Sequence, residues 1–290
     1  MSVNNNFSCI PFYTSLEEQD YRKWYAYGRE YVHRVPNNFL IPFFLVVPSH
    51  VFNISAVVCY KLDGTLHSNI TQAMVDNGLA LYSNNNVTCV VYPANNVTAL
   101  DLPAGCYYLR IDFVGTEGGP HYWSDVFYVE PPALLLKNTI KLEWCNIYNL
   151  AYSDGLIPYE SGFKNILYVI TEIGKPDYNF TEEGEERNGR FFATKQISEK
   201  VYKFSFVAPE YICDALRLVR MSDFINITDR LGRVYNLESF EPEVNWLEFG
   251  YFAEVNCSFN TDTVVKKTGL GYIDNVGDFN NSYNNDYNNQ

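Results

Sequence analysis

Alternating hydrophobic and polar residues mark one stretch in the second half of the chain. Between Val201 and Phe206, the aromatic residues Tyr202, Phe204 and Phe206 fall on one side of an extended backbone. Side chains two positions apart share a face of a strand, so this pattern predicts a strand with one buried face. The rest of the chain has to supply a sheet that closes over that face.

A helical pattern follows this strand. Pro209 suits the first turn of a helix, where its missing N–H costs nothing. Apolar residues then recur at helical spacing and form one face: Tyr211, Ile212, Ala215, Leu216 and Val219. The pattern predicts one short helix over 209–220, a strand over 224–228, a turn at 229–232 and a further strand over 233–237.

Short apolar or alternating segments, separated by turn residues, fill the first half of the chain. The expected strands are 39–47, 54–61, 87–92, 107–114 and 123–129. Strands at this spacing favour a sandwich or a barrel over βαβ units.

The expected strand 107–114 carries the most specific pattern of this half. Its apolar residues alternate with Tyr108, Arg110 and Asp112, which predicts one buried and one solvated face. The segment 102–107 is similar to the tyrosine corner of Greek-key sandwiches. We therefore expect an immunoglobulin-like sandwich over 32–133, without the disulfide of antibody domains.

Proline and low-complexity segments divide the remaining chain. The prolines of 130–132 are expected to end the sandwich, because a proline pair does not continue a central strand. Further strands are expected at 140–150, 165–173 and 253–259. Together with the unit around the helix, they make 137–268 a β-rich domain of α+β type. Residues 269–290 are rich in Asn and cannot bury enough apolar surface to order alone, so a flexible tail is expected.

An aromatic segment precedes the sandwich. Ser15 to Glu18 has the pattern of a capping box, and the short helix it predicts would end near Gly28. Residues 1–31 are expected to form an N-terminal arm that either docks on a neighbouring subunit or folds back onto the first domain. The candidate interface residues are Tyr13, Trp24, Tyr25 and Tyr27.

Composition agrees with a mainly β protein and excludes several classes. Aromatic residues make up 17% of the 290 residues and favour pleated surfaces and interfaces. The net charge of −13, without a basic stripe, argues against nucleic-acid binding. Seven cysteines lie singly, which favours free thiols. The longest apolar run, 39–47, is too short for a membrane span and no signal peptide is evident, so synthesis in the cytoplasm is expected.

Motifs for catalysis, metal binding or nucleotide binding do not occur in the sequence. The four histidines lack a second ligand at metal spacing, so they are expected on the surface or in loops. The acidic run 182–187 lacks the alternating ligands of an EF-hand, so a solvated loop is expected instead of a calcium site. Neither a cofactor nor an enzyme activity is predicted; a hydrolase with dispersed carboxylates is an alternative.

Two groups of segments carry a resemblance to a known family. The first group is 9–13 (CIPFY), 22–28 (RKWYAYG) and 40–43 (LIPF). The second group is 162–168 (GFKNILY), 200–206 (KVYKFSF), 209–211 (PEY), 214–217 (DALR) and 264–267 (VVKK). Together they resemble structural proteins of crAss-like bacteriophages of gut Bacteroidales, over most of residues 9–268.

The resemblance implies a structural role in a virion. Proteins of that family form neck and tail components stacked in rings below the portal. The chain is then expected to contact copies of itself in a ring, a dodecamer in the neck, and neighbouring tail, portal or fibre proteins. It would be made in the host cytoplasm and would carry no active site. The alternative is a carbohydrate-binding β-sandwich adhesin of a phage or bacterial surface, with Tyr122, Trp123 and Trp246 stacked on sugars.

Overall fold

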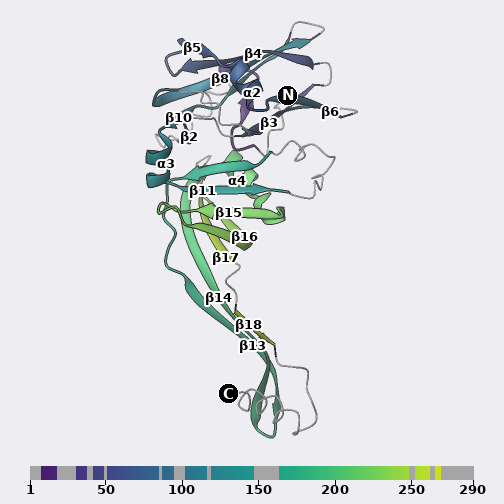
Figure 1. Cartoon of the computed structure of the whole chain (residues 1–290), viewed down its shortest axis with the longest axis vertical. Helices are drawn as coiled ribbons and strands as arrows, with labels where there is room; N and C mark the ends of the chain where they lie inside the picture. The colour runs from purple at the N-terminus through teal and green to yellow at the C-terminus, as the bar shows by residue number, and fades with distance from the viewer. Residues whose placement is uncertain are drawn as a thin grey trace, which may run out of the picture.

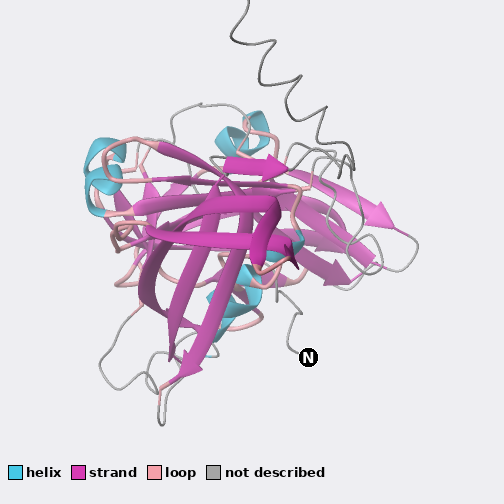
Figure 2. Cartoon of the chain, turned by 90° about the horizontal axis from the view of Figure 1, so that it is seen from below, coloured by secondary structure: helices cyan, strands magenta, loops and turns pink. Residues whose placement is uncertain are grey.

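The fold is mainly β, as the sequence predicts. The computed structural model describes residues 8–17, 31–37, 42–48, 51–84, 87–94, 102–115, 119–146, 163–247, 252–261 and 265–268. Strands account for most of them, and the helices are few and short (Figure 2). Figure 1 shows a long molecule: a β-sandwich at one end, a second large sheet in the middle, and a narrow hairpin at the other end.

The sandwich consists of two sheets. Sheet 1 contains β1 (Phe12–Tyr13), β2 (His33–Pro36), β4 (Val51–Lys61), β5 (Leu66–Asn69), β8 (Gly105–Gly115), β9 (His121–Ser124) and β10 (Phe127–Glu130). Its centre is β8, which pairs antiparallel with β4 along one edge and with β9 and β10 along the other. Sheet 2 contains β3 (Phe43–Pro48), β6 (Ala80–Asn84) and β7 (Val87–Tyr92). The immunoglobulin-like topology stays a prediction.

Two strands of sheet 2, β3 and β7, are buried on both faces. Phe43 and Leu45 pack with Leu109 and Ile111 of sheet 1 in a core that we call the first core. Phe44 points the other way, into the second core described below. Burial on both faces explains why β3 and β7 are continuous apolar runs without alternation.

Two helices in this half were not predicted. They are α2 (Thr71–Asp76) and α3 (Pro132–Asn138). The proline pair follows the end of β10 at Glu130, as expected, and it also starts α3: Pro131 stands at the N-cap position and Pro132 in the first turn, where no N–H is needed. The single strand expected at 123–129 is two strands, β9 and β10, which pair with β8 in registers one residue apart. Between them, the Asp125 carboxylate accepts a bond from the Val126 N–H.

The second half folds around one large sheet, sheet 3. Along the sheet, its strands are β12 (Asn165–Val169), β11 (Ile140–Cys145), β15 (Phe224–Thr228), β16 (Val234–Trp246), β17 (Phe252–Thr261), β14 (Arg190–Pro209) and β13 (Asp177–Arg187), with β18 (Val265–Thr268) also paired to β14. In Figure 1, β11 and β15 run across the molecule while β14 runs along it, so the sheet is strongly twisted.

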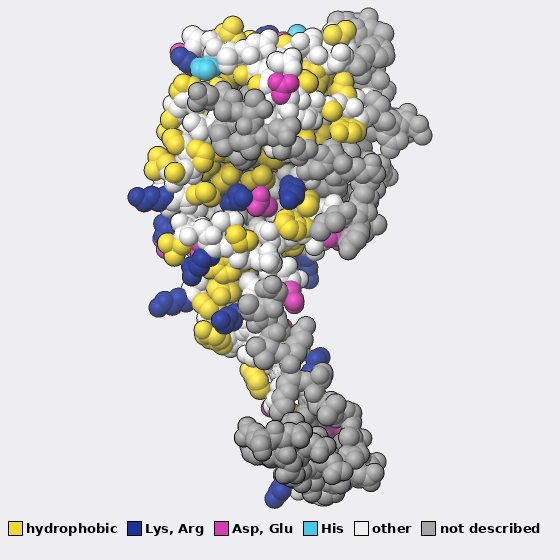
Figure 3. All heavy atoms as spheres, in the orientation of Figure 1, with side chains coloured by type: hydrophobic (Ala, Val, Ile, Leu, Met, Phe, Trp, Pro, Cys, Tyr) yellow, Lys and Arg dark blue, Asp and Glu magenta, His cyan; other side chains and the backbone are white. Residues whose placement is uncertain are grey.

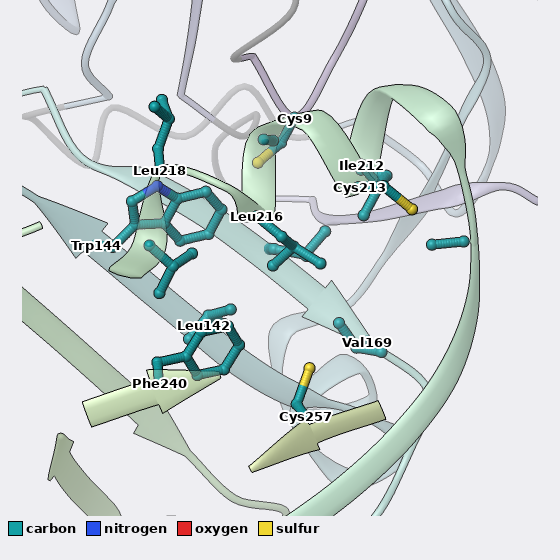
Figure 4. Close-up of a cluster of buried hydrophobic side chains, with 14 of the residues drawn as sticks. Cys9, Leu142, Trp144, Val169, Ile212, Cys213, Leu216, Leu218, Phe240 and Cys257 are labelled. Atoms are coloured by element: carbon teal, nitrogen blue, oxygen red, sulfur yellow. The ribbon is translucent and has the colours of Figure 1, made fainter. Parts of the chain in front are cut away.

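The predicted helix packs onto this sheet. Its α-helical part, α4 (Glu210–Leu216), is shorter than the predicted 209–220 and is followed by a 3₁₀ turn, η3 (Val219–Met221). All five residues of the predicted apolar face are buried. They join Trp144, Leu142 and Phe240 in the second core, where the side chains converge beneath α4 (Figure 4).

The two cores lie on opposite sides of sheet 2. Phe44 is 1% exposed and meets Phe163 of the second half edge-to-face, with ring centroids 5.8 Å apart. Cys89 and Val91 of β7 join the same second core. The two cores thus form one continuous body, and the division into domains at 32–133 and 137–268 stays a prediction.

Candidate functional site: a projecting hairpin arm

The longest strand of the protein leaves the body and forms one side of a hairpin. β14 has 20 residues, which span about 66 Å of extended chain. Its residues Val201 to Pro209 pair with β17 in the body. Its residues Arg190 to Lys200 continue beyond the body and pair with β13 (Figure 1). We call residues 177–200 the arm.

The arm replaces the solvated loop that the sequence predicted at 182–187. The acidic run is part of β13, and its residues face partners on β14: Lys195 bonds Glu183 at 3.1 Å, and Gln196 bonds Glu182. Asn188 and Gly189 form the turn with φ angles of 52° and 73°. Two left-handed residues in a two-residue turn are typical of a tight β-hairpin, so Asn188-Gly189 is the sequence signal that was missed.

One face of the arm carries exposed aromatic rings. Tyr178 lies opposite Lys200 and Phe180 opposite Ser198, so both share the face that Tyr202 and Phe204 present to the second core. Phe191 lies on this face too, opposite Glu186. Tyr178, Phe180 and Phe191, the aromatic stripe, are 71%, 63% and 54% exposed. The face of sheet 3 that is buried in the second core thus continues along the arm, where its aromatic side chains are exposed to solvent.

A glycine shapes the outer part of the arm. The pairing shifts by one residue between Glu183 and Gly184, which is a β-bulge. A Cβ atom at Gly184 would lie 2.2 Å from the Phe192 carbonyl oxygen and 2.7 Å from the Phe191 ring. Only glycine at position 184 leaves room for the Phe191 ring of β14 to lie over β13. Phe192 itself is 49% exposed on the opposite face.

The body around the base of the arm shows mixed exposed side chains. In Figure 3, hydrophobic and basic side chains reach the surface along the body toward the arm. Next to the base lies a polar groove on the outer face of sheet 3, lined by Glu172, Lys203, Ser205, Arg220, Glu241, Glu243, Asn256 and Ser258, among others. Glu241 pairs with Arg220, and Glu172 pairs with Arg230. Glu243 lines the same groove, and the hydrolase alternative stays a prediction.

The interface residues predicted from the sequence fall outside this arm. Tyr13 is 4% exposed, because β1 pairs with β9 and joins sheet 1. Its side chain therefore folds back onto its own chain and offers no surface to a neighbour. Trp24, Tyr25 and Tyr27 lie outside the described residues, as do most of the helix expected after Ser15 and the tail at 269–290.

The aromatic residues considered for sugar binding do not form one platform. Tyr122 is 3% exposed in the first core. Trp123 lies on the outer face of sheet 1, with the Arg110 guanidinium 5.3 Å from its ring centre. Trp246 is 55% exposed, but it belongs to β16 in the second half.

The outer face of sheet 1 is also less solvated than predicted. Tyr108 and Asp112 are 6% and 9% exposed. The Arg110 guanidinium lies over both Tyr60 and Trp123 and forms two contacts with the Asp112 carboxylate, at 2.8 and 2.9 Å. A cluster of aromatic rings around one arginine thus covers this face.

One histidine and most of the cysteines are buried in the described parts of the chain. His33 was expected on the surface or in a loop, but it is 2% exposed on β2, and burial lowers its pKa to about 3. The seven cysteines are free thiols. Burial raises the pKa of Cys59 and Cys89 to about 12, so these thiols stay protonated at neutral pH. The described residues contain no group of three His, Cys, Asp or Glu placed to hold a metal ion.

Comparisons with known proteins identify no relative: no family model matches the chain, and no curated protein matches it. Among the helices that the structure describes, none is long and apolar enough to cross a membrane. Function is therefore argued from the arm, which is the most distinctive exposed feature of the described chain.

Proposed function

We propose that this protein is a virion structural subunit that forms a ring in the neck or tail of a crAss-like phage. It acts through protein–protein contacts with copies of itself and with neighbouring tail, portal or fibre proteins, and it carries out no catalysis. The observation that carries the proposal is the arm, which holds four exposed aromatic side chains away from the body: Tyr178, Phe180, Phe191 and Phe192.

The energetics of the arm favour a partner. Fully burying an exposed aromatic side chain contributes about 2 kcal/mol, and the three rings of the aromatic stripe are 71%, 63% and 54% exposed, so covering them would contribute roughly 4 kcal/mol. This is comparable with the roughly 4–15 kcal/mol that association loses in translational and rotational freedom. Monomers rarely expose such apolar groups side by side unless a partner covers them.

The position of the arm favours a ring over a symmetric dimer. An arm at one end of the molecule can contact a different surface of a neighbour, and the interface is heterologous when the neighbour's arm points to the next copy instead of reaching back. Heterologous contacts repeat from copy to copy, and they close into a ring when the rotation between copies divides a full turn. The continuous body formed by the two cores would keep that rotation constant.

Imaging and mass measurement of the purified full chain test this proposal. The expected result is a closed ring of one stoichiometry, twelve copies for a neck component, and recovery of the protein from purified virions. A chain that stays monomeric at micromolar concentrations and is absent from virions contradicts the proposal.

Matched variants test whether the arm is the contact. Replacing Phe180 and Phe191 by Ser removes two exposed rings of the stripe and is expected to release monomers. Leu231→Ser is the control, because Leu231 is 80% exposed in the turn after β15 and does not belong to the arm. Equal effects of the arm and control variants on ring mass would show that the arm is not the contact.

A further inference from the structure

We infer that the outer edge of β13 is a strand-addition site for an extended, lysine- or arginine-rich segment of another protein. This inference goes beyond the ring proposal and does not depend on it. Strand addition forms a backbone ladder along the open edge of a sheet, and the side chains beside the ladder select the partner.

The open edge of β13 is the first observation. β13 is the last strand of sheet 3, and within the described chain it pairs with β14 alone. Its stretch from Asp177 to Glu183 keeps a regular register with β14 and contains no proline. A long, regular edge of this kind is a template for a further strand.

The opposite edge of the arm already holds a short basic strand. β18, with the sequence Val-Lys-Lys-Thr, pairs antiparallel with Lys195 to Ser198 of β14. It reaches the arm after the last body strand, β17, has ended at Thr261. The arm therefore accepts a separate four-residue strand on one edge, and the pairing geometry on the other edge is equivalent.

Charge decides which partner fits the open edge. β13 carries five carboxylates and one arginine: Asp177, Glu182, Glu183, Glu185, Glu186 and Arg187. Two of the carboxylates already pair with lysines of β14, Asp177 with Lys203 and Glu183 with Lys195, and the strand stays acidic overall. A second β13 added antiparallel around Glu182 would bring Glu182 directly opposite the Glu182 of the other copy, and like charges directly opposite each other destabilise a sheet. A second copy of this edge is therefore disfavoured, and a strand with Lys or Arg beside Glu182 and Glu183 is favoured.

The aromatic stripe adds a preference for apolar side chains. Tyr178 and Phe180 lie on one face of the open edge, so alternate residues of an added strand would lie beside them. The partner segment is thus extended, apolar at alternate positions near the base of the arm, and basic toward the bulge.

Hydrogen–deuterium exchange of the full chain with a synthetic peptide tests the inference. The probe is a peptide with Val at alternate positions followed by two consecutive Lys residues, which can lie beside Glu182 and Glu183 on the two faces of the edge. Its controls are the same peptide with Glu in place of Lys and the same Val–Lys peptide with every amide nitrogen methylated. We expect the Val–Lys peptide alone to slow exchange at least tenfold at some amides within 177–183. Slowing that also occurs with the methylated peptide, or no slowing at all, overturns the inference.

Charge-reversal variants separate the edge from general attraction. Glu182→Lys with Glu183→Lys is expected to weaken peptide binding about tenfold or more. The matched control is Glu241→Lys with Glu243→Lys, which changes the net charge equally on β16, outside the arm. Equal weakening by both pairs would mean attraction by overall charge and would refute a strand-addition site. A ring that forms normally while the peptide protects nothing would refute this inference and leave the proposed function standing.

Discussion

Single carboxylates stabilise several turns and faces of this protein. Asp229 is 5% exposed at the turn between β15 and β16. Its carboxylate accepts bonds from the Leu231 and Arg233 N–H groups, each at 2.9 Å, and from Arg233 Nε at 2.6 Å. Gly232 completes the turn with a φ of 79°. The turn predicted at 229–232 is confirmed, and Asp229 is its centre.

Removing this carboxylate should destabilise the protein in a pH-dependent way. Burial acts to raise the pKa of Asp229, but the bonds from Arg233 and Leu231 outweigh it and lower the pKa below 3.8. The stabilisation is therefore complete above pH 3.8 and is lost as the pH falls through the depressed pKa. Asp229→Ala is expected to lower the free energy of unfolding by about 2 kcal/mol at pH 7.

Urea unfolding at several pH values measures this effect. The gap between the wild type and Asp229→Ala should shrink as the pH drops below 3.8, while Asp229→Asn, which keeps one acceptor oxygen, should lose less at pH 7. A gap independent of pH down to pH 2 would contradict the role given to the charged carboxylate.

Arg110 has a comparable role on the outer face of sheet 1. Arg110→Ala leaves Asp112 buried without its forked partner and removes the cation over Tyr60 and Trp123. We expect a loss of about 2 kcal/mol in the free energy of unfolding. Arg110→Lys should recover less than half of it, because an ammonium cannot form two parallel bonds to a carboxylate. An unchanged urea midpoint for Arg110→Ala would show that the cluster adds no stability.

At the scale of elements, β14 combines two roles in one strand. Its residues from Val201 onward are anchored in the second core by Phe204 and Phe206, whereas residues 191–194 are exposed. The body thus holds the arm in place through a continuous backbone. The outer arm contributes little to the core, because its side chains stay in contact with water.

Shortening the arm should separate assembly from stability. Glu182 and Gln196 lie opposite each other, so residues 183–195 can be replaced by Asn-Gly, which favours a tight hairpin turn. We expect the free energy of unfolding to change by less than about 0.5 kcal/mol, as for other exposed positions, while ring formation is lost. Thermal unfolding and mass measurement check both. A large drop in stability would mean that the arm packs on the body.

At the scale of the whole molecule, sheet 2 couples the two halves of the chain. One sheet supplies Phe43 to the first core and Phe44 to the second. Either half without the other would expose one apolar face of this sheet. The molecule should therefore unfold in a single step, although the sequence analysis predicts two domains, 32–133 and 137–268.

Phe44→Ala tests this coupling. The substitution removes a ring that is 1% exposed, so we expect a loss of about 4 kcal/mol. Amides of both cores should lose protection together in hydrogen exchange, because both cores pack against sheet 2. Tyr82→Ala, at a 37% exposed position on the same sheet, is the control and should change little. Loss of protection in the second core alone would contradict the coupling.

The sequence by itself determined the local features. Alternation placed Phe204 and Phe206 on a buried face, helical spacing placed the apolar face of α4, and turn residues placed the bend at Asp229. These features depend on backbone preferences and on side-chain spacing within a few residues, so they can be recognised without the fold. For the candidate site, Asn188-Gly189 was the available signal, and an exposed hairpin could have been predicted from it.

The tertiary structure alone decided what covers each face. The run Glu182 to Arg187 is a strand because it pairs with β14, where Lys195 and Gln196 lie opposite Glu183 and Glu182. Sheet 2 lies between the two cores because the second half of the chain packs against Phe44. His33 became buried for the same reason, through packing of distant segments. A sequence pattern indicates which side of an element is apolar, but the segment that packs against this side lies far along the chain and is fixed only by the tertiary structure.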